Sequence, residues 1–130
     1  MSKVEQSGGI YIAPGRNIWP HELRVAKILA LAGHRVEFLS ESNLHTPDIC
    51  LDGVEYEIKS PETDKISSLE QSIRTALKQC PNIIVDSLRM KMHEHRARKF
   101  LIRKCQEQRQ IKKMLFITKR GEILDIFKLF

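Results

Sequence analysis

The residues best suited to chemistry lie in one short stretch, residues 47–61. Asp52-Gly53 separates two runs of alternating residues, which predicts a β-hairpin with a two-residue turn. That turn pairs Asp48 with Glu57, and residues opposed in this way project from one face with Cβ atoms roughly 5 Å apart. Lys59 follows Glu57 by two positions and so shares its face. The stretch therefore predicts two carboxylates and an ammonium group side by side.

Two opposed carboxylates repel by on the order of 3 kcal/mol at an effective dielectric of ~20. A hard cation removes this cost, and oxygen ligands suit Mg²⁺ or Mn²⁺, while Zn²⁺ stays open as an alternative. Such an ion polarises a phosphoryl oxygen and lowers the pKa of bound water. Lys59 would orient that water and offset charge on the phosphate. The pattern predicts a metal-dependent phosphodiesterase; the alternative is a solvated edge hairpin in which Glu57 and Lys59 form a surface ion pair.

A third acid, Glu22, lies on the apolar stripe of a predicted helix, residues 20–32. Pro20 suits the first turn of that helix and Gly33 suits its end. The positions three, four, seven and ten residues after Glu22 are apolar, so its carboxylate faces the core, where an unpaired charge is costly. An additional metal-site carboxylate explains this position. The alternative is a first-turn acid that interacts with the helix dipole.

The elements that position these residues follow from periodicity and breakers. Residues 1–18 are expected to form an irregular or extended lead-in, because Gly8-Gly9 and Pro14-Gly15 interrupt regular structure. Further helices are expected at 67–79 and 91–110, and strands at 35–39, 48–51, 54–59, 82–86, 113–118 and 122–127. The length predicts one domain, residues 1–130. The order of elements predicts an α/β (α+β) fold, with a mixed central β-sheet flanked by helices.

Positive charge is concentrated near the C-terminus. Residues 89–120 hold twelve Lys/Arg and two acids, whereas the whole chain has a net charge of +6. This imbalance favours a polyanion as partner, with an ordinary solvated helix face as the alternative. Trp19 is the only tryptophan, so phosphate contacts rather than base stacking are expected to dominate binding. The cations that would follow a phosphate backbone are Arg96, Lys99, Arg103, Arg109 and Lys113.

Composition also sets limits on the class of protein. No run of ~18 apolar residues is present, so no membrane span is predicted, and the first residues lack the apolar stretch of a secretory signal. Cys50, Cys80 and Cys105 form neither a CxxC motif nor a disulfide framework. They are interpreted as free thiols in a reducing environment.

Pro47-Asp48 followed by Glu57-x-Lys59 resembles the signature of PD-(D/E)xK nucleases. The order of elements over residues 20–86 is similar to that of the family as well: a helix, strands that carry the motif, a helix and a further strand. The resemblance implies a PD-(D/E)xK nuclease-like core. In that core Asp48 and Glu57 would be metal ligands, Lys59 would be catalytic, and Glu22 would be the acid that many members carry on their first helix.

Residues 18–90 also resemble the C-terminal tRNase domains of bacterial contact-dependent growth-inhibition toxins of the CdiA type. The resemblance rests on His21-Glu22, Pro47-Asp48, Glu57-x-Lys59-Ser60-Pro61, Gln71-Ser72 and residues 82–86. It implies a nuclease toxin domain that a secreted parent protein delivers into a target bacterium. In that cytoplasm it would cleave RNA, with tRNA as the favoured substrate, until a cognate immunity protein neutralises it.

Three further residues are candidates for supporting roles. Ser60 and Gln71 would hydrogen-bond a phosphate or the waters of the metal, and His21 could reach the site from beside Glu22; loop, cap and surface roles are the alternatives. Two other functions also remain open at this point. One is a DNA endonuclease with the same core, and the other is a non-catalytic, basic nucleic-acid-binding module.

Overall fold

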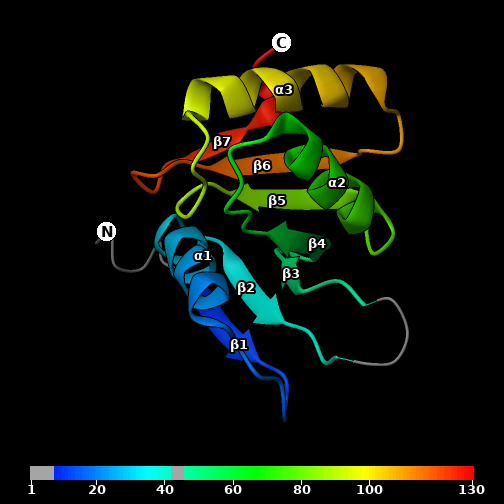
Figure 1. The fold of residues 1–130 in the computed structure, drawn as a ribbon. Helices are drawn as coiled ribbons and strands as arrows, with labels where there is room; N and C mark the ends of the chain where they lie inside the picture. The colour runs from blue at the N-terminus through cyan, green and yellow to red at the C-terminus, as the bar shows by residue number, and fades with distance from the viewer. Residues whose placement is uncertain (1–7, 42–45) are drawn as a thin grey trace.

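The computed structural model describes residues 8–41 and 46–130, which form a mixed β-sheet with helices on both faces. Its strands follow one another across the sheet in chain order, as Figure 1 shows. Neighbours β1–β2, β4–β5 and β5–β6 are parallel, and the other neighbouring pairs are antiparallel. The predicted α/β class is therefore confirmed. The elements are β1 (Gly9–Ile12), α1 (Pro20–Leu31), β2 (Arg35–Phe38), β3 (Ile49–Leu51), β4 (Val54–Lys59), α2 (Ile66–Leu77), β5 (Asn82–Asp86), α3 (Glu94–Glu107), β6 (Lys113–Ile117), β7 (Ile123–Asp125) and the 3₁₀ turn η2 (Ile126–Lys128).

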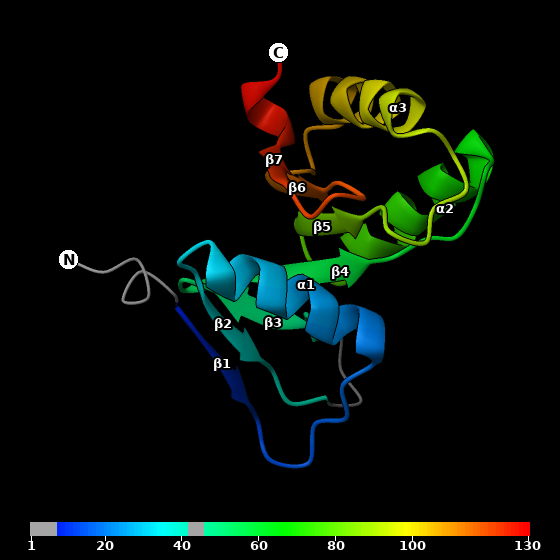
Figure 2. The same cartoon turned by 90° about the vertical axis from the view of Figure 1, so that its left-hand side faces the viewer.

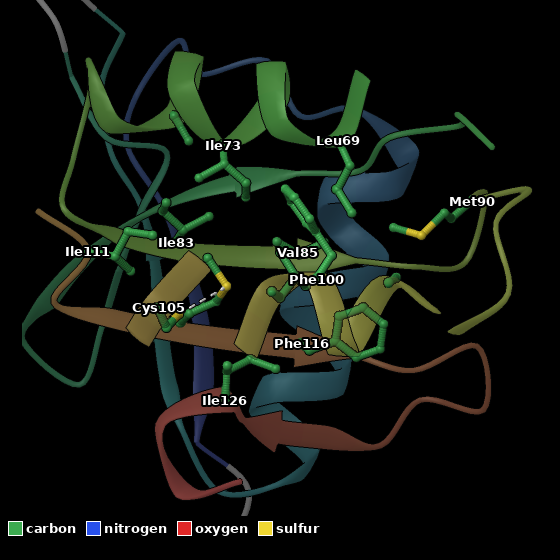
Figure 3. Packing of buried hydrophobic residues seen from close by; sticks show 14 of the residues in the cluster. Leu69, Ile73, Ile83, Val85, Met90, Phe100, Cys105, Ile111, Phe116 and Ile126 are labelled. Atoms are coloured by element: carbon green, nitrogen blue, oxygen red, sulfur yellow. Dashed lines mark hydrogen bonds between the residues drawn. The ribbon is translucent and has the colours of Figure 1, made fainter. Parts of the chain in front are cut away.

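The two faces of the sheet have separate cores. Ile84 of β5 packs with Val25 and Leu29 of α1 on one face. Its neighbours Ile83 and Val85 point to the other face, where they meet α2 and α3 (Figure 3). Figure 2 shows α1 apart from α2 and α3. Because β5 is covered on both faces, every one of its apolar side chains is buried, as expected for a parallel strand at the centre of a sheet.

The hairpin between β3 and β4 has the predicted register. Leu51 lies opposite Val54, and Asp52 and Gly53 both have positive φ, at 50° and 87°. Two positive φ values in a two-residue loop match the twist of the strands on either side. The side chain of Asp52 stabilises the turn by accepting the backbone N–H of Arg35 at 2.7 Å. The turn predicted at 52–53 is confirmed.

The lead-in expected at residues 1–18 is extended over its middle part, where it joins the sheet. Residues 9–12 form β1, an edge strand that pairs in parallel with β2. The glycine-rich sequence carries no local strand pattern, and the partner strand begins 26 residues later, at Arg35. Residues 1–7 of the lead-in, and residues 42–45 of the loop expected before Pro47, lie outside the described residues.

The later elements differ from expectation mainly at their ends. The helix expected at 91–110 spans only 94–107. It begins at Glu94 because the side chain of His93 caps it by accepting the N–H of His95 at 3.2 Å, and it ends where Gln108 adopts an extended backbone conformation. The last strand ends at Asp125, whose carboxylate accepts the N–H of Phe127 and starts the 3₁₀ turn. No helix in the described part of the chain is both long and apolar enough to cross a membrane.

Candidate active site

The predicted acids meet in one pocket of about 270 Å³, where α1 begins and the β3–β4 hairpin opens. We call it the acidic pocket. Glu22 from α1, Asp48 from the segment before β3, and Glu57 from β4 all line it. The remaining lining residues are Arg16, Trp19, Glu41, Thr46, Pro47 and Gln79.

Asp48 and Glu57 are brought together by the hairpin. The N–H of Asp48 donates to the carbonyl of Tyr56 at 3.1 Å, and its carboxylate accepts the N–H of Ile58 at 2.7 Å. The β3–β4 ladder ends with Ile49 opposite Tyr56, and these two bonds hold Asp48 against β4 just beyond that end, where it interacts with Glu57 as predicted. Burial is the main cause that raises the pKa of Asp48 above its ordinary value.

Glu57 is the most perturbed carboxyl group of the site. Burial, followed by repulsion from Asp48, raises its pKa from 4.5 to about 7, against the lowering effect of Lys59. Its Oε1 atom is buried and finds no hydrogen-bond partner among the described residues. A carboxylate in this environment is destabilised unless it binds a proton or a cation.

Lys59 lies beside this carboxylate, with its Nζ 3.5 Å from Glu57 Oε2. The two residues share a face of β4, as their spacing predicted. The alternative of a solvated edge hairpin is wrong, because β4 lies between β3 and β5 and Glu57 is only 7% exposed. The ammonium group thus contacts Glu57, although Lys59 is not among the residues that line the acidic pocket.

Arg16 is the residue of the pocket that the sequence analysis missed. Its guanidinium is 3.3 Å from Glu22 and 3.7 Å from Asp48, and the side chain is 3% exposed. It also donates through Nε to the carbonyl of Leu39. The signal available in the sequence was Glu22 itself, since a carboxylate on a core-facing stripe requires a partner. That partner turns out to be a cation from the segment before α1.

Glu22 has two partners in the structure. Besides Arg16, its Oε1 accepts the backbone N–H of Trp19 at 3.0 Å, which closes the first turn of α1. Within residues 8–41 and 46–130, no three His, Cys, Asp or Glu side chains are arranged to hold a metal ion. Asp48 and Glu57 remain as a pair that fits a hard divalent cation: they supply oxygen donors, both have raised pKa values, and one Glu57 oxygen is unpartnered among the described residues.

Comparison with known families gives a match over residues 45–123, more than half of the chain and including the Asp48-to-Lys59 motif. The matching family is described as the contact-dependent growth inhibition CdiA C-terminal domain. This chain belongs to that family. A comparison with curated proteins found no match. The resemblance inferred from the motifs is therefore confirmed at the level of the CdiA toxin domain.

This CdiA C-terminal domain also shares its fold with a solved structure. The relative is described as a CdiA-CT/CdiI toxin and immunity complex from Burkholderia pseudomallei. It superposes with a TM-score of 0.68 over 90% of this chain and 98% of the relative, at 18% sequence identity. At that identity the likeness shows a common fold.

The three predicted supporting residues do not line the acidic pocket. Ser60 donates to Asp86, a fully buried carboxylate at the end of β5. Gln71 is exposed on α2, where it bonds to neighbouring side chains of the same helix. His21 lines a separate hollow next to Trp19. Gln79, at the end of α2, lines the acidic pocket instead and carried no signal in the sequence.

The cations predicted to bind nucleic acid are split between elements. Arg96, Lys99 and Arg103 share one exposed face of α3, and the guanidinium of Arg103 lies 5.9 Å from the ring of Phe100. Arg109 and Lys113 are exposed but lie beyond α3, the second at the start of β6. The five cations therefore do not lie on one helix, because α3 ends at Glu107.

Proposed function

We propose that this CdiA C-terminal domain is a metal-dependent endonuclease that hydrolyses phosphodiester bonds of RNA, with tRNA as its substrate. The observation that carries the proposal is the pair formed by the buried Glu57 and the half-buried Asp48, with Lys59 3.5 Å from Glu57. A carboxyl group with a pKa raised to about 7 costs stability at neutral pH. Groups perturbed in this way are typical of functional sites, where the cost is offset by catalysis.

Each residue has a defined part in this mechanism. Asp48 and Glu57 would hold a divalent cation, which when bound lowers the pKa of water and polarises a phosphoryl oxygen. Lys59 brings its ammonium group to the phosphate and offsets the negative charge that develops there. Arg16 holds Asp48 and Glu22 in place and reduces their mutual repulsion.

The choice of RNA over DNA is supported by the resemblance of residues 18–90 to tRNase toxin domains. The exposed cations Arg96, Lys99 and Arg103 supply a surface for phosphate contacts in addition to the site. By the same resemblance, the domain would act in the cytoplasm of a target bacterium after delivery by a secreted parent protein. The Burkholderia relative is described as a toxin and immunity complex, and we extend this to a cognate immunity protein for this domain.

The proposal is tested by incubating the protein with tRNA and with supercoiled plasmid DNA, each with Mg²⁺, with Mn²⁺ or with EDTA. The expected result is cleavage of tRNA in Mg²⁺ or Mn²⁺ and none in EDTA, with the cut positions read by sequencing the fragments. Cleavage of the plasmid alone would indicate a DNA endonuclease. Binding without cleavage in every metal would contradict hydrolysis and favour a nucleic-acid-binding module.

A further inference from the structure

A second hollow adjoins the acidic pocket. It has a volume of about 470 Å³ and is lined by Trp19, Pro20, His21 and Arg89. Trp19 lines the acidic pocket as well, so the two hollows share this residue. A chain bound with one phosphodiester in the acidic pocket can therefore continue into this hollow by passing over Trp19.

The backbone of Trp19 is hydrogen-bonded to the pocket, but its side chain belongs to neither hydrophobic core. Its backbone N–H donates to Glu22 Oε1 at 3.0 Å, which ties it to an acid of the pocket. Its side chain is 66% exposed, more than any other aromatic side chain of the described residues. An exposed indole gains little from folding, whereas a flat ring exposed at the wall of a site is suited to stacking on a base.

Arg89 supplies the charge that a nucleotide requires. Its Nη2 donates to the carbonyl of Ser60 at 2.9 Å, so it is anchored to the residue that follows Lys59. Its Nη1 lies 3.9 Å from Glu62, and the side chain remains 40% exposed. An anchored guanidinium with free N–H groups is well suited to bind a phosphate oxygen.

We propose that this hollow binds an unpaired nucleotide of the RNA next to the cleaved bond, with its base stacked on Trp19 and its phosphate bound by Arg89. The proposal takes RNA from the proposed function but does not depend on hydrolysis. A nucleotide fits better than a protein side chain, because the hollow continues from the pocket in which a phosphodiester would lie.

The single tryptophan of the chain makes the test direct, because all tryptophan emission arises from Trp19. The Lys59→Ala variant is kept in EDTA to prevent cleavage and is titrated with a single-stranded RNA of ten nucleotides. A fluorescein-labelled copy of that RNA measures total binding by polarisation in parallel. The expected result is saturable quenching of Trp19 emission with the same midpoint as polarisation, together with reduced quenching by iodide.

Substitutions in the Lys59→Ala background then separate the two contacts. Trp19→Ala is expected to weaken RNA binding about ten-fold, within the range for loss of one base stack, whereas Trp19→Phe retains most of the affinity. Arg89→Ala is expected to weaken binding and to flatten its salt dependence. Leu31→Ala, an exposed apolar residue of α1, and Arg74→Ala, an exposed cation of α2, are the matched controls and should change affinity less than two-fold. Circular dichroism checks that each variant is folded.

The proposal is overturned if the labelled RNA binds while Trp19 emission stays constant, or if Trp19→Ala binds as tightly as its parent. Trp19 would then be free to contact a protein partner. Absence of RNA binding at low salt would overturn it too. Cleavage of tRNA by the unaltered protein is measured separately. Cleavage without a response of Trp19 contradicts only this subsite, and a response without cleavage contradicts only hydrolysis.

Discussion

The acidic pocket and the exposed face of α3 differ in how far their charged groups are exposed to water. The pocket holds a few charged groups that are removed from water, and Glu57 and Asp48 have raised pKa values as a result. The cations on the face of α3 are exposed to solvent. One of them, Arg96, donates a hydrogen bond to the backbone carbonyl of Asp64. An exposed charge costs the fold little free energy, whereas a charge buried in the pocket needs a counter-charge, a proton or a bound cation.

This contrast shows that the number of charges is a weaker indicator of a site than their burial. The sequence contains twelve Lys/Arg between residues 89 and 120, and they dominate its charge pattern. The pocket is lined by only four acids and one arginine, yet it contains the strongly shifted carboxyl group and an unpartnered buried oxygen among the described residues. Substitutions in the pocket should therefore have larger effects than substitutions on α3.

The largest effect is expected for Lys59→Ala. Removal of the ammonium group beside Glu57 takes away the charge that offsets the developing negative charge on phosphate, so kcat/KM for tRNA cleavage should fall by about 10²–10³. Initial rates on a sequencing gel measure it. Lys65→Ala, an exposed lysine before α2, is the control and should retain full activity. A decrease of only a few-fold would show that Lys59 is a structural partner of Glu57.

Arg16→Met should have the next largest effect, on stability. It leaves Glu22 and Asp48 without their cation, and breaking a buried ion pair costs about 3 kcal/mol or more. Urea unfolding should show this loss at pH 7.5 and a smaller loss at pH 4, where more of the carboxyl groups are protonated. Arg109→Met, at an exposed position, is the control. Equal stability of Arg16→Met and the unaltered protein at pH 7.5 would contradict the interpretation of the pocket.

Glu57→Gln should stabilise the protein in a pH-dependent way. The folded protein binds a proton at Glu57 up to a pKa of about 7, whereas the unfolded chain releases it near 4.5. The loss of stability caused by ionised Glu57 is therefore absent below about pH 4.5, grows as the pH rises, and is complete above about pH 7. Glu57→Gln should remove a destabilisation on the order of 3 kcal/mol at pH 8 and leave stability nearly unchanged at pH 4.

Urea unfolding at the two pH values measures this difference, and Glu55→Gln, an exposed neighbour on β4, is the control. The same Glu57→Gln variant should lose tRNA cleavage, because the amide is a poor substitute for a metal-binding carboxylate. Greater stability together with lost activity would confirm that the pair is maintained at a cost to the fold. A gain of the same size at both pH values would contradict the assigned pKa.

The smallest effect is expected from the face of α3. Replacing Arg96, Lys99 and Arg103 together by alanine should flatten the slope of log affinity for RNA against log salt by about 2, because each phosphate that a cation neutralises adds about 0.7 to that slope. The free energy of unfolding should change by less than about 1 kcal/mol, because the side chains are exposed. A triple variant with the same charge change, at Arg74, Lys78 and Lys128, is the control. An unchanged slope would remove α3 from the RNA-binding surface.

The hairpin shows what could be predicted from the sequence. The Asp52-Gly53 turn and the alternation on either side of it act within about a dozen residues. Together they set the register that brings Asp48 close to Glu57, with Lys59 beside Glu57. The apolar run of β5 was predicted over the residues that form it for a similar reason, since a strand buried on both faces is continuously apolar.

The parts that could not be predicted involve segments far apart in the chain. The strand β1 is defined by its pairing with β2, which begins 26 residues later at Arg35. Arg16 meets Asp48 across 32 residues, and no periodicity links the two positions. The exposure of Trp19 at the wall of two hollows depends on the position of Arg89, seventy residues later.

By itself, the amino-acid order determined the hairpin, its register and the pairing of two acids with a lysine, since turn geometry and two-residue periodicity are local. Only the tertiary structure decided that Glu57 is buried, that Arg16 neutralises Glu22 and Asp48, and that Trp19 borders the site. These properties depend on which distant segments pack over the hairpin and exclude water from it. The raised pKa of Glu57 arises mainly from this exclusion of water, and so the chemistry of the site is a property of the folded protein.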